Sequence, residues 1–163
     1  MSVLNQKTIK KCIKFDGIGL HSGKKVIMTL FPAQPNTGII FKRVDLKNNN
    51  IIYSSVFNVS NASYCTKLTN ENGVTVSTVE HLMAALCGLG IDNLLVELNS
   101  EELPIMDGSA KPFLEAFLKA GTKQLNQERK YLKIQKKFEF SDGERKISIE
   151  PSEKSFEVEF QLN

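Results

Sequence analysis

The chain has 163 residues, 41% of them hydrophobic, which is enough for the core of one ordinary domain, or of one domain and part of another. Its 21 Lys and Arg exceed its 18 Asp and Glu by a net charge of +3, and the basic residues are spread along the chain. This pattern argues against a nucleic-acid-binding protein and favours a small anionic ligand.

The N-terminal segment carries lysines without an apolar run after them, so we expect neither a signal peptide nor a transmembrane segment. The three cysteines, Cys12, Cys65 and Cys87, are widely spaced and form no CxxC pair. Such spacing is typical of reduced thiols in a cytoplasmic protein, and it excludes a zinc ribbon.

Alternating apolar residues and turn signals predict strands through the first part of the chain. A hairpin is expected from residues 9–15 and 26–31, because glycines separate these two apolar segments. Helices are expected at residues 79–87 and 112–119, where Pro112 suits a helix start and Gly121 a helix end. Further strands are expected at residues 39–44, 65–69, 74–77 and 94–98, which makes the fold class α+β.

The polar residues 122–130 are interpreted as a linker between a first domain, residues 1–121, and the opening of a second, residues 131–163. The last part predicts three antiparallel strands, each with one apolar face, and no helix follows to cover them. We therefore expect an incomplete second domain that self-associates through its uncovered strands. The clearest alternation places Phe156, Val158, Phe160 and Leu162 on one face.

The sequence STVEHLMAALCGLGIDN, residues 77–93, places a glutamate and a histidine side by side at the start of a helix. In one reading, Ser77 and Glu80 form a capping box and Glu80 is structural. In the other, His81 binds a metal and Glu80 is a general base beside it. Both readings stay open here, because a zinc site needs three or four ligands and the chain has one other histidine, His21.

His21 and Asp107 are both interpreted as loop residues, Asp107 making local backbone hydrogen bonds before the second helix. On the first helix, a helical projection places His81 on a face opposite the apolar one. That face consists of small residues instead of charged ones, so we expect a ligand or a second domain to approach it closely. Its other members are Ala84, Ala85 and Gly88.

Three motifs, taken together, resemble one known family. They are GIGLHSGKK at residues 17–25, the helix sequence above, and LPIMDGSAKPF at residues 103–113. In this order and spacing they are similar to the N-terminal half of the UDP-3-O-acyl-N-acetylglucosamine deacetylases, the zinc amidases of bacterial lipid A synthesis. The resemblance implies two similar domains, each a two-layer sandwich of a β-sheet with two helices, and an active site in the cleft between them.

The resemblance assigns Glu80 as catalytic base and His81 as a ligand of the zinc ion (Zn2+). It implies that zinc activates a water, that Glu80 accepts its proton, and that the resulting hydroxide attacks the acetamide carbonyl of UDP-3-O-acyl-N-acetylglucosamine. Substrate-binding positions follow from the same match: Leu20, Ser63 and Cys65 line the cleft, Arg145 lies near the nucleotide, and Lys146 is an equally sound candidate from charge alone.

In the family, the other zinc ligands and a general acid come from the second domain, beyond the position where this chain stops at Asn163. We therefore expect an N-terminal fragment of the deacetylase that is inactive alone. The alternative is a non-catalytic domain, derived from the deacetylase, that binds a nucleotide sugar or a partner protein.

Overall fold

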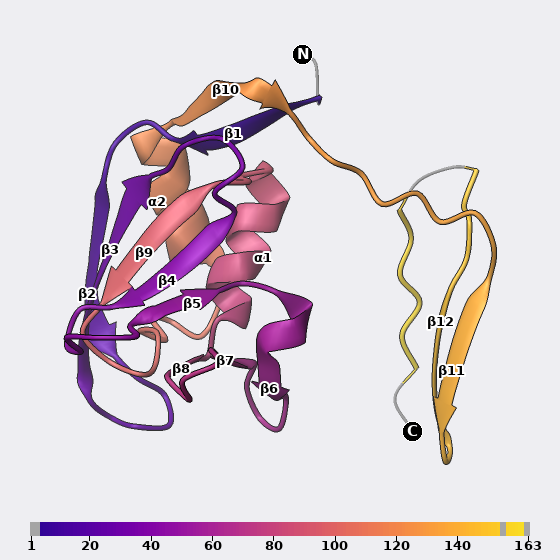
Figure 1. Cartoon of the computed structure of the whole chain (residues 1–163), viewed down its shortest axis with the longest axis horizontal. Helices are drawn as coiled ribbons and strands as arrows, with labels where there is room; N and C mark the ends of the chain where they lie inside the picture. The colour runs from indigo at the N-terminus through magenta and orange to yellow at the C-terminus, as the bar shows by residue number, and fades with distance from the viewer. Residues whose placement is uncertain (1–3, 154–155, 162–163) are drawn as a thin grey trace. The chain divides into compact units, whose positions relative to one another are not determined.

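The computed structural model describes residues 4–153 and 156–161, and the chain divides into two units, Met1–Arg129 and Lys130–Asn163 (Figure 1). Every described sheet lies within one unit. The first unit contains both described α-helices and most of the strands.

A five-stranded mixed sheet forms the centre of the first unit. The neighbouring strands β9 (Leu94–Leu98) and β4 (Ile39–Arg43) are parallel, whereas the other neighbours are antiparallel. Parallel neighbours need a long crossover connection, and here the crossover contains a small second sheet and a helix. In spatial order the strands are β2 (Ile13–Ile18), β3 (Lys25–Pro32), β9 (Leu94–Leu98), β4 (Ile39–Arg43) and β5 (Ile51–Tyr53).

The expected hairpin is confirmed, since β2 and β3 pair antiparallel with Phe15 opposite Met28. Ile9, however, does not belong to it. The chain bends at residues 10 and 11, so Ile9 ends a separate strand, β1 (Asn5–Ile9). Ile9 and Phe15, which the alternation assigns to one strand, therefore lie in two different strands.

Two helices of ten residues each, α1 (Glu80–Leu89) and α2 (Lys111–Ala120), pack against this sheet (Figure 1). Both expected helices are confirmed, with ends that differ by one or two residues from the expected ones. In the described part of the chain, neither helix is long and apolar enough to cross a membrane.

The core lies between the helices and one face of the sheet. In β3 the alternate residues Met28 and Leu30 are fully buried, while Ile27 on the other face is exposed. From α2, Phe113 packs its ring edge-to-face on Phe15, with ring centroids 5.1 Å apart. The α+β fold class, with helices on one face of a sheet, is thereby confirmed.

A small three-stranded sheet leads into α1. It consists of β6 (Val59–Asn61), β7 (Lys67–Thr69) and β8 (Thr75–Ser77), and a 3-10 turn, η1 (Val56–Asn58), precedes it. Only Thr78 and Val79 separate β8 from α1. The small sheet therefore leads directly into the first turn of α1.

Strand β10 (Thr122–Glu128) pairs antiparallel with β1, so most of the segment interpreted as a linker is a strand. Its side chains are mostly exposed, which explains the polar composition, because an outer ribbon is held by backbone hydrogen bonds. Arg129 then donates to the carbonyl of Gly90, and its Nε lies 2.8 Å from Oδ1 of Asp92. The two ends of the first unit are thus joined to each other and to the loop after α1.

The second unit contains a hairpin of β11 (Phe138–Asp142) and β12 (Arg145–Ile149), with Gly143 in the turn at φ 59°. Phe140 lies opposite Ile147 on an exposed apolar face. Residues 131–137 and 156–161 are not in strands, although the alternation predicts strands there, and Leu162 lies outside the described residues. No helix occurs in the described part of this unit.

Candidate functional site

The start of α1 differs from the expected capping box. Val79 occupies the cap position, and no side chain makes a capping hydrogen bond. Ser77 is buried at the end of β8, where its hydroxyl donates to the carbonyl of Glu101 at 3.2 Å. The capping-box reading is therefore wrong, because a long-range contact uses the Ser77 side chain.

Glu80 and His81 lie together on the first turn of α1. Oε2 of Glu80 accepts a 3.0 Å hydrogen bond from the backbone N–H of Thr66, and Oε1 lies 3.9 Å from Nε2 of His81. The Glu80 and His81 side chains are 36% and 29% exposed, respectively. One oxygen thus anchors the carboxylate while the other faces a partly open imidazole, an arrangement that suits proton transfer to or from a bound molecule.

The small-residue face of α1 is partly as expected. Ala84 and Gly88 are exposed, and a methyl group added at Gly88 would meet no atom within 4 Å. Ala85 is buried, which corrects the projection, because the helix presses this residue against the core as well. Within the described structure, the remaining face is open to an approaching surface.

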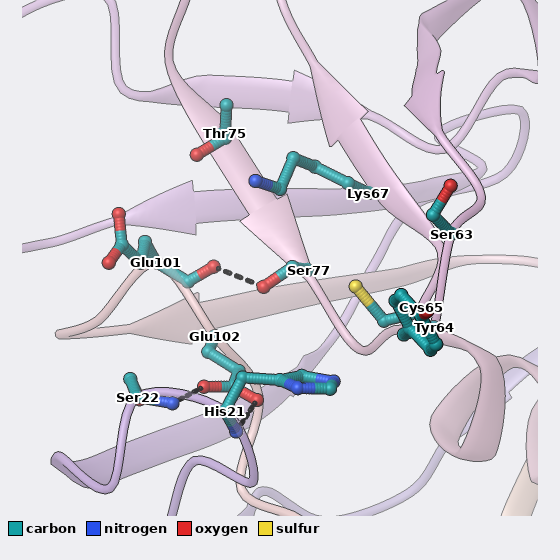
Figure 2. Close-up of a pocket in the computed structure, with 10 residues that line it drawn as sticks. All are labelled: His21, Ser22, Ser63, Tyr64, Cys65, Lys67, Thr75, Ser77, Glu101 and Glu102. Carbon is teal, nitrogen blue, oxygen red and sulfur yellow. Dashed lines mark hydrogen bonds between the residues drawn. The ribbon is translucent and has the colours of Figure 1, made fainter.

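A polar pocket of about 360 Å³ lies between the β2–β3 turn, the small sheet and the segment after β9 (Figure 2). Cys65, on its wall, directly precedes Thr66, whose N–H holds Glu80. The short segment Cys65–Thr66 therefore contacts both the pocket and the Glu80 carboxylate. The lining residues are His21, Ser22, Ser63, Tyr64, Cys65, Lys67, Thr75, Ser77, Glu101 and Glu102.

The residues singled out in the sequence are distributed unevenly around this pocket. Ser63 and Cys65 line it, and Leu20, 58% exposed in the β2–β3 turn, is not among the lining residues. Arg145 and Lys146 begin β12 in the second unit, where both are exposed. The proposed substrate-binding residues thus divide between the two units.

Sequence reasoning missed Glu102, which is 2% exposed at the base of the pocket. Burial by itself raises the pKa of this carboxyl, but hydrogen bonds from His21, Ser22 and Thr78 outweigh burial and lower the pKa below its ordinary value. The sequence signal is the acidic pair Glu101–Glu102, which follows β9 after two residues. That signal does not distinguish the exposed Glu101 from the buried Glu102.

The loop reading of Asp107 is confirmed. Its Oδ1 accepts hydrogen bonds from the N–H of Ser109 at 2.9 Å and from the Ser109 hydroxyl at 2.8 Å. The Ser109 hydroxyl is the main reason that the pKa of Asp107 is lowered. Asp107 therefore shapes the turn before α2.

Fold and site together define a class: an α+β domain in which a Glu–His pair at a helix start lies next to a polar pocket. The chain matches the family described as UDP-3-O-acyl N-acetylglycosamine deacetylase over residues 6–163, and it belongs to that family.

Among curated relatives, the UDP-3-O-acyl-N-acetylglucosamine deacetylase of Pseudoalteromonas atlantica is 46% identical over 161 residues, which cover 99% of this chain and 53% of that protein. Proteins of the same name from Haemophilus influenzae (strain PittEE) and Blochmanniella pennsylvanica are 43% and 44% identical over 161 residues. These matches cover 99% of this chain and 52% and 54% of the two relatives. The chain therefore spans about half the length of the curated relatives it matches.

Proposed function

We propose that this chain supplies the N-terminal part of an active site that hydrolyses the N-acetyl group of UDP-3-O-acyl-N-acetylglucosamine. The proposed reaction is a zinc-dependent step of lipid A biosynthesis in the bacterial cytoplasm. Membership of the deacetylase family supports it. The observation that carries it is the anchored, partly exposed Glu80 carboxylate beside His81.

Glu80 is the proposed general base. Amide hydrolysis requires a group that accepts a proton from the attacking water. The hydrogen bond from Thr66 holds Oε2, so the carboxylate keeps a defined orientation while Oε1 is available to accept that proton.

The described residues do not by themselves make a metal site. Within residues 4–153 and 156–161, no three His, Cys, Asp or Glu side chains are grouped so as to hold a metal ion. His81 is proposed as one zinc ligand, and because a catalytic zinc site uses three protein ligands, two more must lie outside these residues. When bound, zinc would act as a Lewis acid.

Two groups of residues are proposed to bind the substrate. Ser63 and Cys65 offer a hydroxyl and a thiol inside the pocket, and Leu20, exposed in the chain next to the lining residue His21, is a further candidate. Arg145 and Lys146 are proposed to contact the nucleotide diphosphate, because both are exposed cations next to a tight turn.

Self-association is a further proposal. Supporting it, the hairpin of the second unit has an apolar face whose four large side chains are all exposed: Phe138, Phe140, Ile147 and Ile149. We also propose that this hairpin opens a second domain similar to the first. In that case the rest of that domain competes with a second copy for the same face.

The test is complementation with the part of a relative that this chain lacks. This chain, the complementary polypeptide and zinc are mixed, and release of acetate from the UDP-sugar is measured. Turnover by the mixture, absent from either polypeptide alone and lost with Glu80→Gln, is the expected result. A mixture that forms a stable complex but releases no acetate overturns the proposal.

A non-catalytic domain that binds a nucleotide sugar or a partner is the second candidate. The pocket lined by polar residues next to the start of α1 favours it, because such a pocket can bind a polar ligand without catalysis. Calorimetric binding of the UDP-sugar by this chain, together with an inert mixture in the complementation assay, is the result that distinguishes it.

A further inference from the structure

The carboxylate of Glu102 joins three separate segments of the chain. Oε1 accepts hydrogen bonds from the N–H of His21 at 2.9 Å and from the hydroxyl of Thr78 at 3.1 Å. Oε2 accepts a 2.8 Å hydrogen bond from the N–H of Ser22. Figure 2 shows both turn amides directed at the two carboxylate oxygens.

The β2–β3 turn is shaped to receive this carboxylate. A Cβ atom at Gly19 would overlap Oε2 of Glu102 and the hydroxyl of Ser22, closer than real Cβ atoms approach other atoms. The backbone of Gly19 also closes the turn, because its carbonyl accepts a hydrogen bond from the N–H of Gly23 at 3.0 Å. Glycine is therefore required at position 19 by close approach.

Thr78, the third partner, has a backbone conformation that β-branched residues rarely adopt, with φ 58°. Such a conformation persists only where the surroundings hold it, and it tends to occur at functional sites. Two backbone hydrogen bonds hold the neighbouring Ser77, its N–H donating to Glu101 and its carbonyl accepting from Leu103. Thr78 lies two residues before Glu80 in the sequence, and its hydroxyl donates the hydrogen bond to Glu102.

We propose that Glu102 is a positioning residue for the site at the start of α1. By holding the His21–Ser22 turn and Thr78 with one buried carboxylate, it sets the place of the His21 side of the pocket relative to Glu80 and His81. This inference rests on the proposed deacetylase function for its catalytic meaning. The contacts of the Glu102 carboxylate with His21, Ser22 and Thr78, called the clamp below, can be tested without an activity measurement.

The chemistry of the clamp calls for a carboxylate. Three donors converge on the group, two amides and one hydroxyl, so an acceptor-only side chain satisfies all of them. A glutamine at position 102 has one carbonyl oxygen, and its NH2 group would face a backbone N–H. Glu102→Gln therefore keeps the size of the side chain and breaks at least one of the three contacts.

The first experiment is amide hydrogen exchange by NMR on this chain. In Glu102→Gln, the amides of His21 and Ser22 are expected to exchange about tenfold faster or more, the scale for loss of a hydrogen bond to a charged group. Glu101→Gln is the matched control, because that neighbouring glutamate is exposed and pairs with Lys24 at 3.5 Å. Unchanged exchange at His21 and Ser22 in Glu102→Gln overturns the proposal.

A second variant covers the case in which Glu102→Gln does not fold. Thr78→Val removes the hydroxyl and keeps the β-branched shape, so it tests the link to α1 alone. The N–H of Met83 donates to the carbonyl of Val79 at 2.9 Å in the first turn of α1, and its exchange is expected to accelerate. If it does not, Glu102 does not position the helix start, and the proposal is wrong.

The catalytic meaning is tested in the complementation assay. With an active wild-type mixture, Glu102→Gln is expected to lower kcat about tenfold or more with little change in KM, and the double variant with Thr78→Val should lose less than the product of the two effects. Equal kcat in Glu102→Gln and wild type overturns the positioning role. An inactive wild-type mixture counts against the proposed function instead, and the exchange measurements still decide the clamp.

Discussion

The backbone N–H of Thr66 donates a 3.0 Å hydrogen bond to Oε2 of Glu80, across 14 residues of chain. This contact joins the loop before β7 to the first turn of α1. It gives the Glu80 carboxylate an orientation that helix capping does not provide here, since Val79 occupies the cap position. The mutational consequences of this relationship separate the structural role of Glu80 from its proposed chemical role.

Glu80→Gln is expected to leave stability nearly unchanged, because a glutamine carbonyl can still accept from Thr66. The free energy of unfolding, measured by urea denaturation, should change by about 0.5 kcal/mol or less. In the complementation assay the same change should lower turnover about a hundredfold or more, the usual scale for loss of a general base. Glu115→Gln, an exposed helix position, is the matched control; unchanged turnover in Glu80→Gln would falsify the catalytic assignment.

This chain alone is expected to bind zinc weakly, because one imidazole does not make a three-ligand site. Isothermal titration with zinc, after chelator treatment, should show no tight one-to-one binding. His81→Ala should leave the isotherm of the isolated chain almost unchanged. A tight site that His81→Ala removes would mean that these residues, or two copies of the chain, supply a further set of ligands.

The free energy of unfolding of the first unit should decrease at acidic pH because the Glu102 carboxylate becomes protonated. Its pKa is lowered in the folded chain, so the unfolded chain takes up the proton at higher pH. The stabilisation is therefore fully present above the unfolded pKa of about 4.3 and is lost as the pH falls through the lower folded pKa. Urea denaturation between about pH 3 and pH 6 should show a smaller decrease for Glu102→Gln than for wild type.

Other ionisable groups lie close to Glu102. His21 lies in the clamped turn, and Glu101 pairs with Lys24 beside it. Asp45, whose pKa is lowered by its hydrogen bonds with Arg43, should account for part of the decrease that remains. Identical pH dependence in wild type and Glu102→Gln is the result that contradicts this prediction.

Two glycines should respond oppositely to alanine. Gly19→Ala places a methyl group against Glu102 and Ser22, and it should destabilise the chain by about 1–3 kcal/mol. Gly88→Ala lies on the open face of α1 with nothing near it, and it should stabilise the chain by about 0.5–1 kcal/mol through helix propensity. Urea denaturation of both variants gives the comparison, and a neutral Gly19→Ala would show that the turn does not fit tightly around the carboxylate.

The chain should self-associate through the hairpin of its second unit. Light scattering is expected to show an average mass that rises with concentration, because exposed apolar sheet faces promote association. The double change Phe138→Ser and Phe140→Ser should shift the protein toward monomer. Ser148→Ala, opposite Glu139 on the other face of the hairpin, is the control; a strict monomer for wild type at high concentration contradicts the idea.

Local patterns in the sequence were sufficient to predict most of the helices and strands of the first unit. The strand expected at residues 94–98 has those bounds as β9, and both helices lie where periodicity, Pro112 and Gly121 place them. The reason is that apolar periodicity and helix-end residues act within a few positions of one another. The same local reading places Glu80 and His81 on the first turn of a helix, and the three motifs together indicate the family.

Tertiary structure alone decided which polar groups meet. Ser77 bonds to Glu101, which excludes the capping box, and Thr122–Glu128 is a strand because β1, more than a hundred residues earlier, pairs with it. Glu102 stands beside Glu101 in the sequence, yet only Glu102 is buried among the donors of His21, Ser22 and Thr78. Such contacts join backbone amides and hydroxyls that are distant in sequence, and every residue type except proline carries the same backbone N–H. Composition and periodicity do not predict which donor a carboxylate will contact. The clamp at the base of the pocket therefore depends on the tertiary structure, which brings residues 21–22, 78 and 102 together.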